Sequence, residues 1–185
     1  MQPRIFIVVP CYNEESVISE TSYRLREKIN SLVSKGEIAD NSRIVFVDDG
    51  SKDKTWEMIS GLNAGDKLFQ GIRLSGNRGH QNALLAGLMT VREIADAVIS
   101  MDADLQDDIN AVDEMIDKFR SGCDIVYGVR SSRKTDSIFK RTSAQSYYKM
   151  MEKLGAKTVY NHADYRLMSR RALEALSSFG EVNLF

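Results

Sequence analysis

The alternation of short apolar runs with amphipathic stretches constrains the fold of this sequence more than any other feature. Residues 5–9 are uncharged and rich in β-branched side chains, which is typical of a strand buried on both faces of a parallel sheet. We expect further strands at 43–47, 69–74, 97–101, 124–128 and 163–168, and helices at about 15–33, 53–62, 81–94, 109–120, 136–154 and 169–177. Strands joined through helices form βαβ crossovers. The sequence therefore predicts an α/β fold with a mostly parallel central sheet and helices on both of its faces.

Length and charge limit the classes of function. A chain of 185 residues suits one domain, and its formal net charge of −1 does not favour nucleic acid as a partner. The charge is unevenly distributed, because residues 130–157 hold eight basic side chains and two acidic ones, a local charge of +6. A patch of this kind favours a phosphate-bearing partner or a membrane surface. A homo-oligomer is left open.

Two cysteines, Cys11 and Cys123, are too few for a disulfide framework and lack metal-ligand spacing, which favours a reduced, cytoplasmic setting. No window approaches the roughly 18 apolar residues of a membrane span. The predicted helix at 136–154 is amphipathic and basic. It suits a membrane surface, although packing against the chain's own sheet is the more frequent use of such a helix.

Two carboxylates follow the predicted strand at 97–101. Asp102 and Asp104 are one residue apart, and Gln106 comes next. In open α/β sheets ligands bind outside the carboxyl ends of the strands. Carboxylate and amide oxygens are suitable ligands for Mg²⁺ or Mn²⁺, and these ions often bind the oxygens of a substrate phosphate as well. The stretch predicts a metal-bridged diphosphate; the alternative is a solvated acidic loop, since Asp107 and Asp108 follow.

Polar residues also follow the first two predicted strands. Pro10, Tyr12 and Glu14 come after the first, and Asp48 and Asp49 come after the second. Carboxylates there can accept hydrogen bonds from a nucleobase or a ribose, and Tyr12 offers a flat face for a base. The alternatives are a plain turn at 48–51 and core packing for Tyr12. Because all these strand ends meet at one edge of the sheet, we favour a nucleotide pocket.

A series of motifs in this order resembles the inverting glycosyltransferases of family 2, which have the GT-A fold. The motifs are P-x-Y-N-E-E from Pro10, V-D-D-G-S-x-D-x-T from Val47, Asn77-Arg78-Gly79 leading to Ala83 and Gly87, M-D-A-D-L-Q from Met101, and V-Y-G-V-R from Val126. Later stretches are similar to the branch that moves a sugar from a nucleotide onto a polyisoprenyl phosphate such as bactoprenol or dolichol phosphate. These stretches are Arg130-x-x-Arg133, Asp136-Ser137-x-x-Lys140-Arg141 and Ala163-Asp164-Tyr165-Arg166-Leu167-Met168.

The resemblance implies roles for residues at matching positions. Pro10, Tyr12, Glu14 and Asp48 would hold the nucleoside, and we place Asp49, Asp102 and Ala103 in the same nucleotide-sugar site. Asp102, Asp104 and Gln106 would hold Mg²⁺ or Mn²⁺ and the diphosphate. Arg130 matches an arginine that contacts phosphate, and Asp164 matches an acid near the reacting centre. The donor base is expected to be uracil, with guanine open, and the sugar is not determined.

The sequence departs from this branch in two places. Asp107-Asp108-Ile109 replaces the usual D-P-P or D-P-E, which should change only the start of a helix. The membrane helices that usually follow the catalytic domain are also absent. We therefore expect residues 1–185 to be a single catalytic domain truncated before membrane segments. It would be soluble alone, and the longer protein would work at the cytoplasmic face of the membrane.

The chemistry of the acceptor can be argued from the residues themselves. A hydroxyl acceptor needs a general base, a role open to Asp164. A phosphate monoester has a second pKa near 6, is already an anion at neutral pH and needs cationic positioning instead. Arg130, Arg133, Lys140 and Arg141 meet that need, and we assign catalytic roles to Asp164, Arg130 and Arg133. Direct displacement by the phosphate would invert the anomeric centre.

Other readings are disfavoured or kept as alternatives. A phospho-receiver domain carries its acid pair after the first strand, whereas here the pair follows the second. A dinucleotide oxidoreductase needs G-x-G-x-x-G after the first strand, which this chain lacks. Transfer to a hydroxyl of a polysaccharide or glycolipid remains the second choice within the enzyme class. His80 opens a predicted helix after Gly79 and could face the diphosphate. Neither His80 nor His162 has a ligand-spaced partner, however, and both are expected to be non-catalytic.

Overall fold

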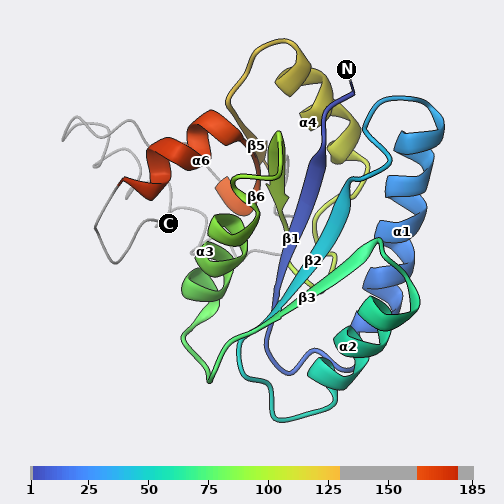
Figure 1. Ribbon diagram of the computed structural model, residues 1–185, viewed down its shortest axis with the longest axis vertical. Helices are drawn as coiled ribbons and strands as arrows, with labels where there is room; N and C mark the ends of the chain where they lie inside the picture. The colour runs from blue at the N-terminus through green and yellow to red at the C-terminus, as the bar shows by residue number, and fades with distance from the viewer. Residues whose placement is uncertain (1, 130–161, 179–185) are drawn as a thin grey trace, which may run out of the picture.

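The computed structural model describes residues 2–129 and 162–178, and its centre is a six-stranded sheet with strand order β3-β2-β1-β4-β6-β5 (Figure 1). Strands β3, β2, β1 and β4 are parallel, and β6 runs antiparallel to its neighbours β4 and β5. The α/β fold with a mostly parallel sheet is thus confirmed. The strands are β1 (Ile5–Cys11), β2 (Arg43–Asp48), β3 (Phe69–Arg73), β4 (Ala97–Ser100), β5 (Ile125–Val129) and β6 (His162–Ser169).

Helices cover both faces of this sheet, as Figure 1 shows. Because side chains alternate along a strand, Ile5 and Ile7 of β1 face one apolar cluster while Phe6 and Val8 face the other. The first cluster packs against α1 (Ile18–Ser34), α2 (Thr55–Gly65) and α4 (Ala111–Arg120). The second packs against α3 (His80–Val91) and α6 (Arg170–Ser177). Two-sided burial explains why the central strands are continuous apolar runs.

Helix α3 lies unusually close to the sheet. A Cβ atom at Gly87 would be 2.5 Å from Val8 Cγ1 and 2.8 Å from Val47 Cγ2, distances at which real side chains overlap. Glycine therefore lets the helix axis approach β1 and β2. The close approach fixes the position of the helix, and with it the position of His80 at its first turn.

The sheet has its topological switch point between β1 and β4. The chain moves outward from β1 to β2 and β3, then returns to place β4 on the other side of β1. At such a point the loops after the two central strands diverge to opposite sides and leave a crevice at their carboxyl ends. The loops at 12–17 and 101–110 follow β1 and β4 and border this crevice.

Several element boundaries differ from the sequence-based expectation. Helix α1 begins at Ile18 rather than near residue 15. Helix α2 begins at Thr55, and Lys54 rather than Asp53 holds its N-cap position. The expected helix at 136–154 lies outside the described residues. Within the residues that are described, no helix is both long enough and apolar enough to cross a bilayer.

Candidate active site

A polar pocket lies at the switch point. Its volume is about 360 Å³, within the usual range of about 300–1,000 Å³ for ligand sites. The side chains that line it, hereafter the switch-point pocket, are Pro10, Glu14, His80, Asp102, Ala103 and Asp104. The structure thus brings together five residues that the sequence analysis placed in one site. It also places His80 in this pocket, a residue expected from the sequence to be non-catalytic.

Negative charge is concentrated in the switch-point pocket. The pKa of the Glu14 carboxyl is raised above its usual value of about 4.5, first by burial and then by Asp104, Asp53 and Asp102. These carboxylates repel one another, and a divalent cation would offset their repulsion. In the described part of the chain, no three Asp, Glu, His or Cys side chains are grouped to enclose a metal ion. Asp102 and Asp104 offer carboxylate oxygens, which suit an ion that shares its coordination with a phosphate and water, as Mg²⁺ commonly does.

Asp104 is held in place by Gln106. The Gln106 backbone N–H donates to Asp104 Oδ1 at 3.2 Å, and its side-chain Nε2 donates to Oδ2 at 2.7 Å. Leu105, between them, has a φ of 51°, in the left-handed region that a leucine rarely adopts. Gln106 here orients the carboxylate, and the role of its oxygen as a metal ligand stays a prediction.

Helix α1 fixes the same loop from the other side. The hydroxyl of Thr21 donates to the carbonyl oxygen of Ala103 at 2.5 Å, in a contact buried from solvent. This bond joins residues 82 positions apart in the sequence. The backbone between Asp102 and Asp104 is therefore positioned by the fold as well as by its own sequence.

The loops after β1 and β2 hold each other through hydrogen bonds. Asn13 receives a bond at its side chain from the backbone N–H of Lys52 at 2.9 Å and donates its own N–H to Ser51 Oγ at 2.9 Å. The Glu14 N–H donates to Thr55 Oγ1 at 2.8 Å. These bonds use the residues just before α1 and explain why that helix begins later than expected. They also fix Glu14 at the pocket.

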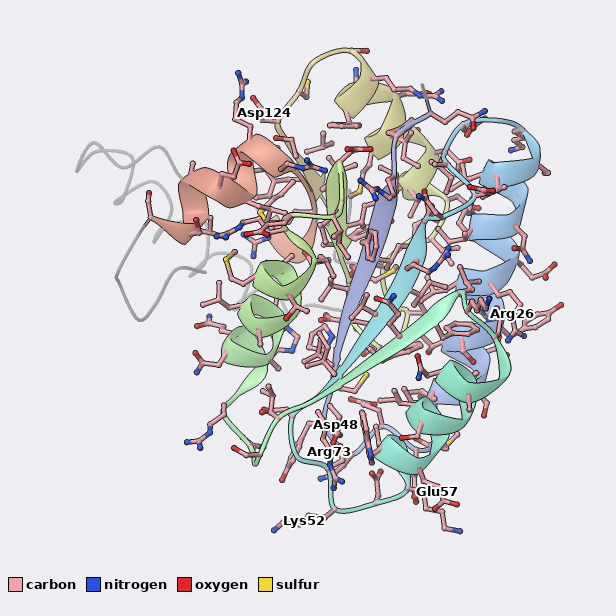
Figure 2. The ribbon with its side chains drawn as sticks, in the orientation of Figure 1. Arg26, Asp48, Lys52, Glu57, Arg73 and Asp124 are labelled. Carbon is pink, nitrogen blue, oxygen red and sulfur yellow. The ribbon has the colours of Figure 1, made fainter. Side chains whose placement is uncertain are left out.

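Asp48 is completely buried at the end of β2. Its Oδ1 accepts the Ser51 N–H at 3.2 Å, while Oδ2 has no hydrogen bond and lies 3.6 Å from Arg73 Nε. The Arg73 guanidinium also stacks over the Trp56 ring, 5.5 Å from its centroid. Figure 2 shows Asp48 and Arg73 next to each other at this end of the sheet. A buried carboxylate oxygen without a hydrogen bond is an available acceptor for a ligand N–H.

Asp49 has a different environment from its neighbour. Its Oδ1 accepts the backbone N–H of Arg78 at 2.7 Å, and its Oδ2 accepts that of Gly79 at 2.8 Å. The side chain is buried. In this structure Asp49 holds the loop before α3 in place through these two hydrogen bonds. A direct contact of Asp49 with the nucleotide remains a prediction.

Tyr12 lies at the surface in the loop after β1, between Pro10 and Glu14. The residue is 38% exposed, which argues against the alternative that it packs in the core. Exposure leaves a ring face open for stacking, as expected for a base-binding tyrosine.

Strand β6 brings the region of Asp164 to the same edge of the sheet. Arg166 pairs with Ser100 of β4, and the two strands run in opposite directions. The start of β6, which includes Asp164, therefore lies near the end of β4, where Asp102 follows. Arg130, Arg133, Lys140 and Arg141 lie outside the described residues.

Comparison with known proteins identifies the family. The sequence model of the family described as glycosyl transferase family 2 matches residues 6–177. The chain belongs to this family. The glycosyltransferase is 53% identical over 184 residues to the uncharacterized glycosyltransferase YkoT of Bacillus subtilis, covering all of this chain and 55% of that protein. It is 38% identical over 183 residues to the bactoprenol glucosyl transferase of Shigella phage SfX, covering 98% of this chain and 57% of that protein. The glycosyltransferase chain thus spans little more than half the length of these relatives.

Solved structures confirm the GT-A fold of this glycosyltransferase. Glucosyl-3-phosphoglycerate synthase of Mycobacterium tuberculosis, in complex with Mn²⁺, UDP and glucosyl-3-phosphoglycerate, matches with a TM-score of 0.60 and 18% identity, covering 91% of this chain and 57% of the other. Residues 1–349 of TarS from Staphylococcus aureus match with a TM-score of 0.59 and 16% identity, covering 95% and 50%.

The repulsion in the pocket of this glycosyltransferase leads to a first prediction. Replacing Glu14 with glutamine is expected to raise the melting temperature of the ligand-free enzyme at pH 7. The folded-state pKa of Glu14 lies above its unfolded value, so folding becomes less favourable as the pH rises through that raised pKa. At about pH 4 the Glu14 carboxyl is largely protonated and as neutral as the glutamine that replaces it. The difference in melting temperature between the two proteins should therefore shrink.

Thermal unfolding at both pH values measures this effect. Glu27→Gln is the matched control, because Glu27 is an exposed glutamate of α1 that does not line the pocket. A gain of the same size in the control, or no gain for Glu14→Gln at pH 7, would contradict the prediction.

Proposed function

We propose that this glycosyltransferase moves a hexose from a uridine diphosphate sugar to a polyisoprenyl phosphate at a membrane surface, with inversion of the anomeric centre. The observation that carries the proposal is the meeting of Glu14, Asp102 and Asp104 in one pocket at the switch point of the sheet. The name of the bactoprenol glucosyl transferase relative supports the choice of acceptor.

The geometry of the loop after β4 supports the donor half of the proposal. Asp102 and Asp104 would hold Mg²⁺ or Mn²⁺ together with the donor diphosphate, and the hydrogen bonds from Gln106 keep Asp104 oriented for this. The bound ion would act as a Lewis acid that offsets the charge on the leaving diphosphate. The Mn²⁺ and UDP bound in the mycobacterial structure of the same fold support this assignment.

The nucleoside would lie beside the diphosphate, between the loops that follow β1 and β2. Asp48 Oδ2 is buried without a hydrogen bond and suits a base N–H, and the exposed ring of Tyr12 suits stacking. Pro10 lines the same pocket and would contact the nucleoside.

The acceptor half rests on the basic segment at 130–157, with its local charge of +6. A phosphate monoester is anionic at neutral pH, so its oxygen can attack without a strong base. Arg130, Arg133, Lys140 and Arg141 would bind it and place it opposite the leaving group. Attack from that side converts an α-linked donor into a β-linked product.

A second candidate is transfer to a hydroxyl group. The position of Asp164 at the start of β6, at the same edge of the sheet as Asp102, favours it, since a hydroxyl acceptor needs a nearby base.

The test is donor binding followed by transfer. Thermal unfolding would be measured with UDP-glucose, UDP-galactose, UDP-N-acetylglucosamine and GDP-mannose, each with Mn²⁺ or EDTA. A donor at 100 times its Kd should add about 2.7 kcal/mol of stability. Labelled hexose from the stabilising donor is then offered to a polyisoprenyl phosphate presented in vesicles and to the matching alcohol. Transfer to the phosphate alone is expected. Metal-independent binding or transfer to the alcohol would contradict the proposal.

A further inference from the structure

His80 lies in the switch-point pocket, where its place after Gly79 at the start of a helix left it able to face a diphosphate. It is the first residue of α3, and its Nε2 lies 3.6 Å from Asp102 Oδ1. The other side chains that line the pocket in the described part of the chain are anionic or apolar. His80 is therefore the only lining side chain there that offers an N–H donor.

The position of His80 is built into the fold. The loop before it is tied to the end of β2 by the two hydrogen bonds from Arg78 and Gly79 to the buried carboxylate of Asp49. Gly79 has a φ of 88°, a conformation that favours glycine and turns the chain into the helix. Further along α3, the absence of a side chain at Gly87 lets the helix pack closely against β1 and β2. These contacts come from different parts of the sequence, and together they fix the position of the backbone that carries His80.

We propose that His80 donates a hydrogen bond to the diphosphate of the donor and that Asp49 is the positioning residue that holds it there. The inference rests on the proposed function and assigns a further contact within it. The pocket holds three carboxylates, those of Glu14, Asp102 and Asp104. A diphosphate bound there is also negatively charged, so its oxygens need N–H donors that the carboxylates do not supply. The imidazole beside Asp102 supplies one. A ring N–H is the donor that an imidazole has for a phosphate oxygen.

The test compares ligands with and without phosphate. In the presence of Mn²⁺, His80→Ala is expected to weaken UDP binding by about 10- to 100-fold, the usual range for a hydrogen bond to a charged group. Uridine binding should not change, because uridine lacks the diphosphate. His80→Gln, which restores an N–H donor, should recover part of the loss. Isothermal titration of the whole chain measures all three.

The outcomes separate the inference from the proposed function. If the unaltered enzyme binds UDP and His80→Ala binds it equally well, or if His80→Ala weakens uridine as much as UDP, the inference is overturned. If the unaltered enzyme binds no nucleotide, the proposed function fails first. Thr90→Ala is the control for effects on the helix itself, because Thr90 is an exposed residue near the C-terminal end of α3. This variant should bind UDP as the unaltered enzyme does.

Asp49 is tested through its dependence on His80. Asp49→Asn replaces one acceptor oxygen by an amide that cannot accept an N–H, so it should displace the loop and weaken UDP more than uridine. In the His80→Ala background it should cause little further loss, since the two changes remove the same contact. Fully additive losses would refute the positioning role. Circular dichroism checks the folding of Asp49→Asn, and the contact of His80 with the diphosphate is decided by the His80 variants alone.

Discussion

Replacing Asp104 with asparagine is expected to lower hexose transfer by about a thousandfold and to abolish the metal-dependent part of donor binding. The neutral amide removes a charge that would hold the cation opposite the leaving diphosphate. It also places an NH₂ group against the donors of Gln106, which now orient the carboxylate. A loss of about 4 kcal/mol of transition-state stabilisation corresponds to this factor. Transfer of labelled hexose and thermal unfolding with Mn²⁺ or EDTA measure the two effects.

The control comes from the same acidic stretch. Asp108 is an exposed aspartate that bonds the backbone N–H of Asn110 at 2.9 Å and does not line the pocket. Asp108→Asn should keep nearly full transfer and full metal dependence. Equal behaviour of the two variants would mean that residues 102–108 form only a solvated acidic loop.

A second large effect is expected on the acceptor side. Changing both Arg130 and Arg133 to alanine should lower kcat/KM for a polyisoprenyl phosphate by about a thousandfold, because each arginine would contribute a charge-assisted hydrogen bond worth about 1.5–3 kcal/mol. The stability conferred by UDP and Mn²⁺ should change little, since the proposed donor site is built from other residues. Arg24→Ala is the control, because Arg24 pairs with Glu20 on the surface of α1.

Asp164 distinguishes the two acceptor classes. With a phosphate acceptor, Asp164→Asn should lower kcat/KM less than the change of Arg130 and Arg133 to alanine, since the nucleophile is already an anion. With a hydroxyl acceptor the order would reverse, because loss of a general base usually costs about 10²- to 10⁴-fold. A severe loss in Asp164→Asn together with an active Arg130 and Arg133 double variant would therefore favour the hydroxyl acceptor.

The sequence by itself determined most of the sheet and much of the pocket. Strands buried on both faces need continuous apolar runs, so β1, β2 and β4 could be recognised from local composition. Parallel strands bring their carboxyl ends to one edge, so the motifs that follow β1 and β4 were expected to meet. The structure does bring Pro10, Glu14, Asp102, Ala103 and Asp104 into one pocket.

Only the tertiary structure decided the features that depend on long-range contacts. The insertion of β6 between β4 and β5 leaves no local signal, because strand pairing is set between residues far apart in the sequence. Helix α1 starts late because residues 13–15 bond to the loop after β2 instead of beginning the helix. Both oxygens of Asp49 accept hydrogen bonds from the loop before α3, a positioning role that the local pattern did not indicate, and its contact with the nucleotide stays a prediction. His80 reaches the pocket from the opposite face of the sheet, because glycine at position 87 lets α3 lie close to β1 and β2.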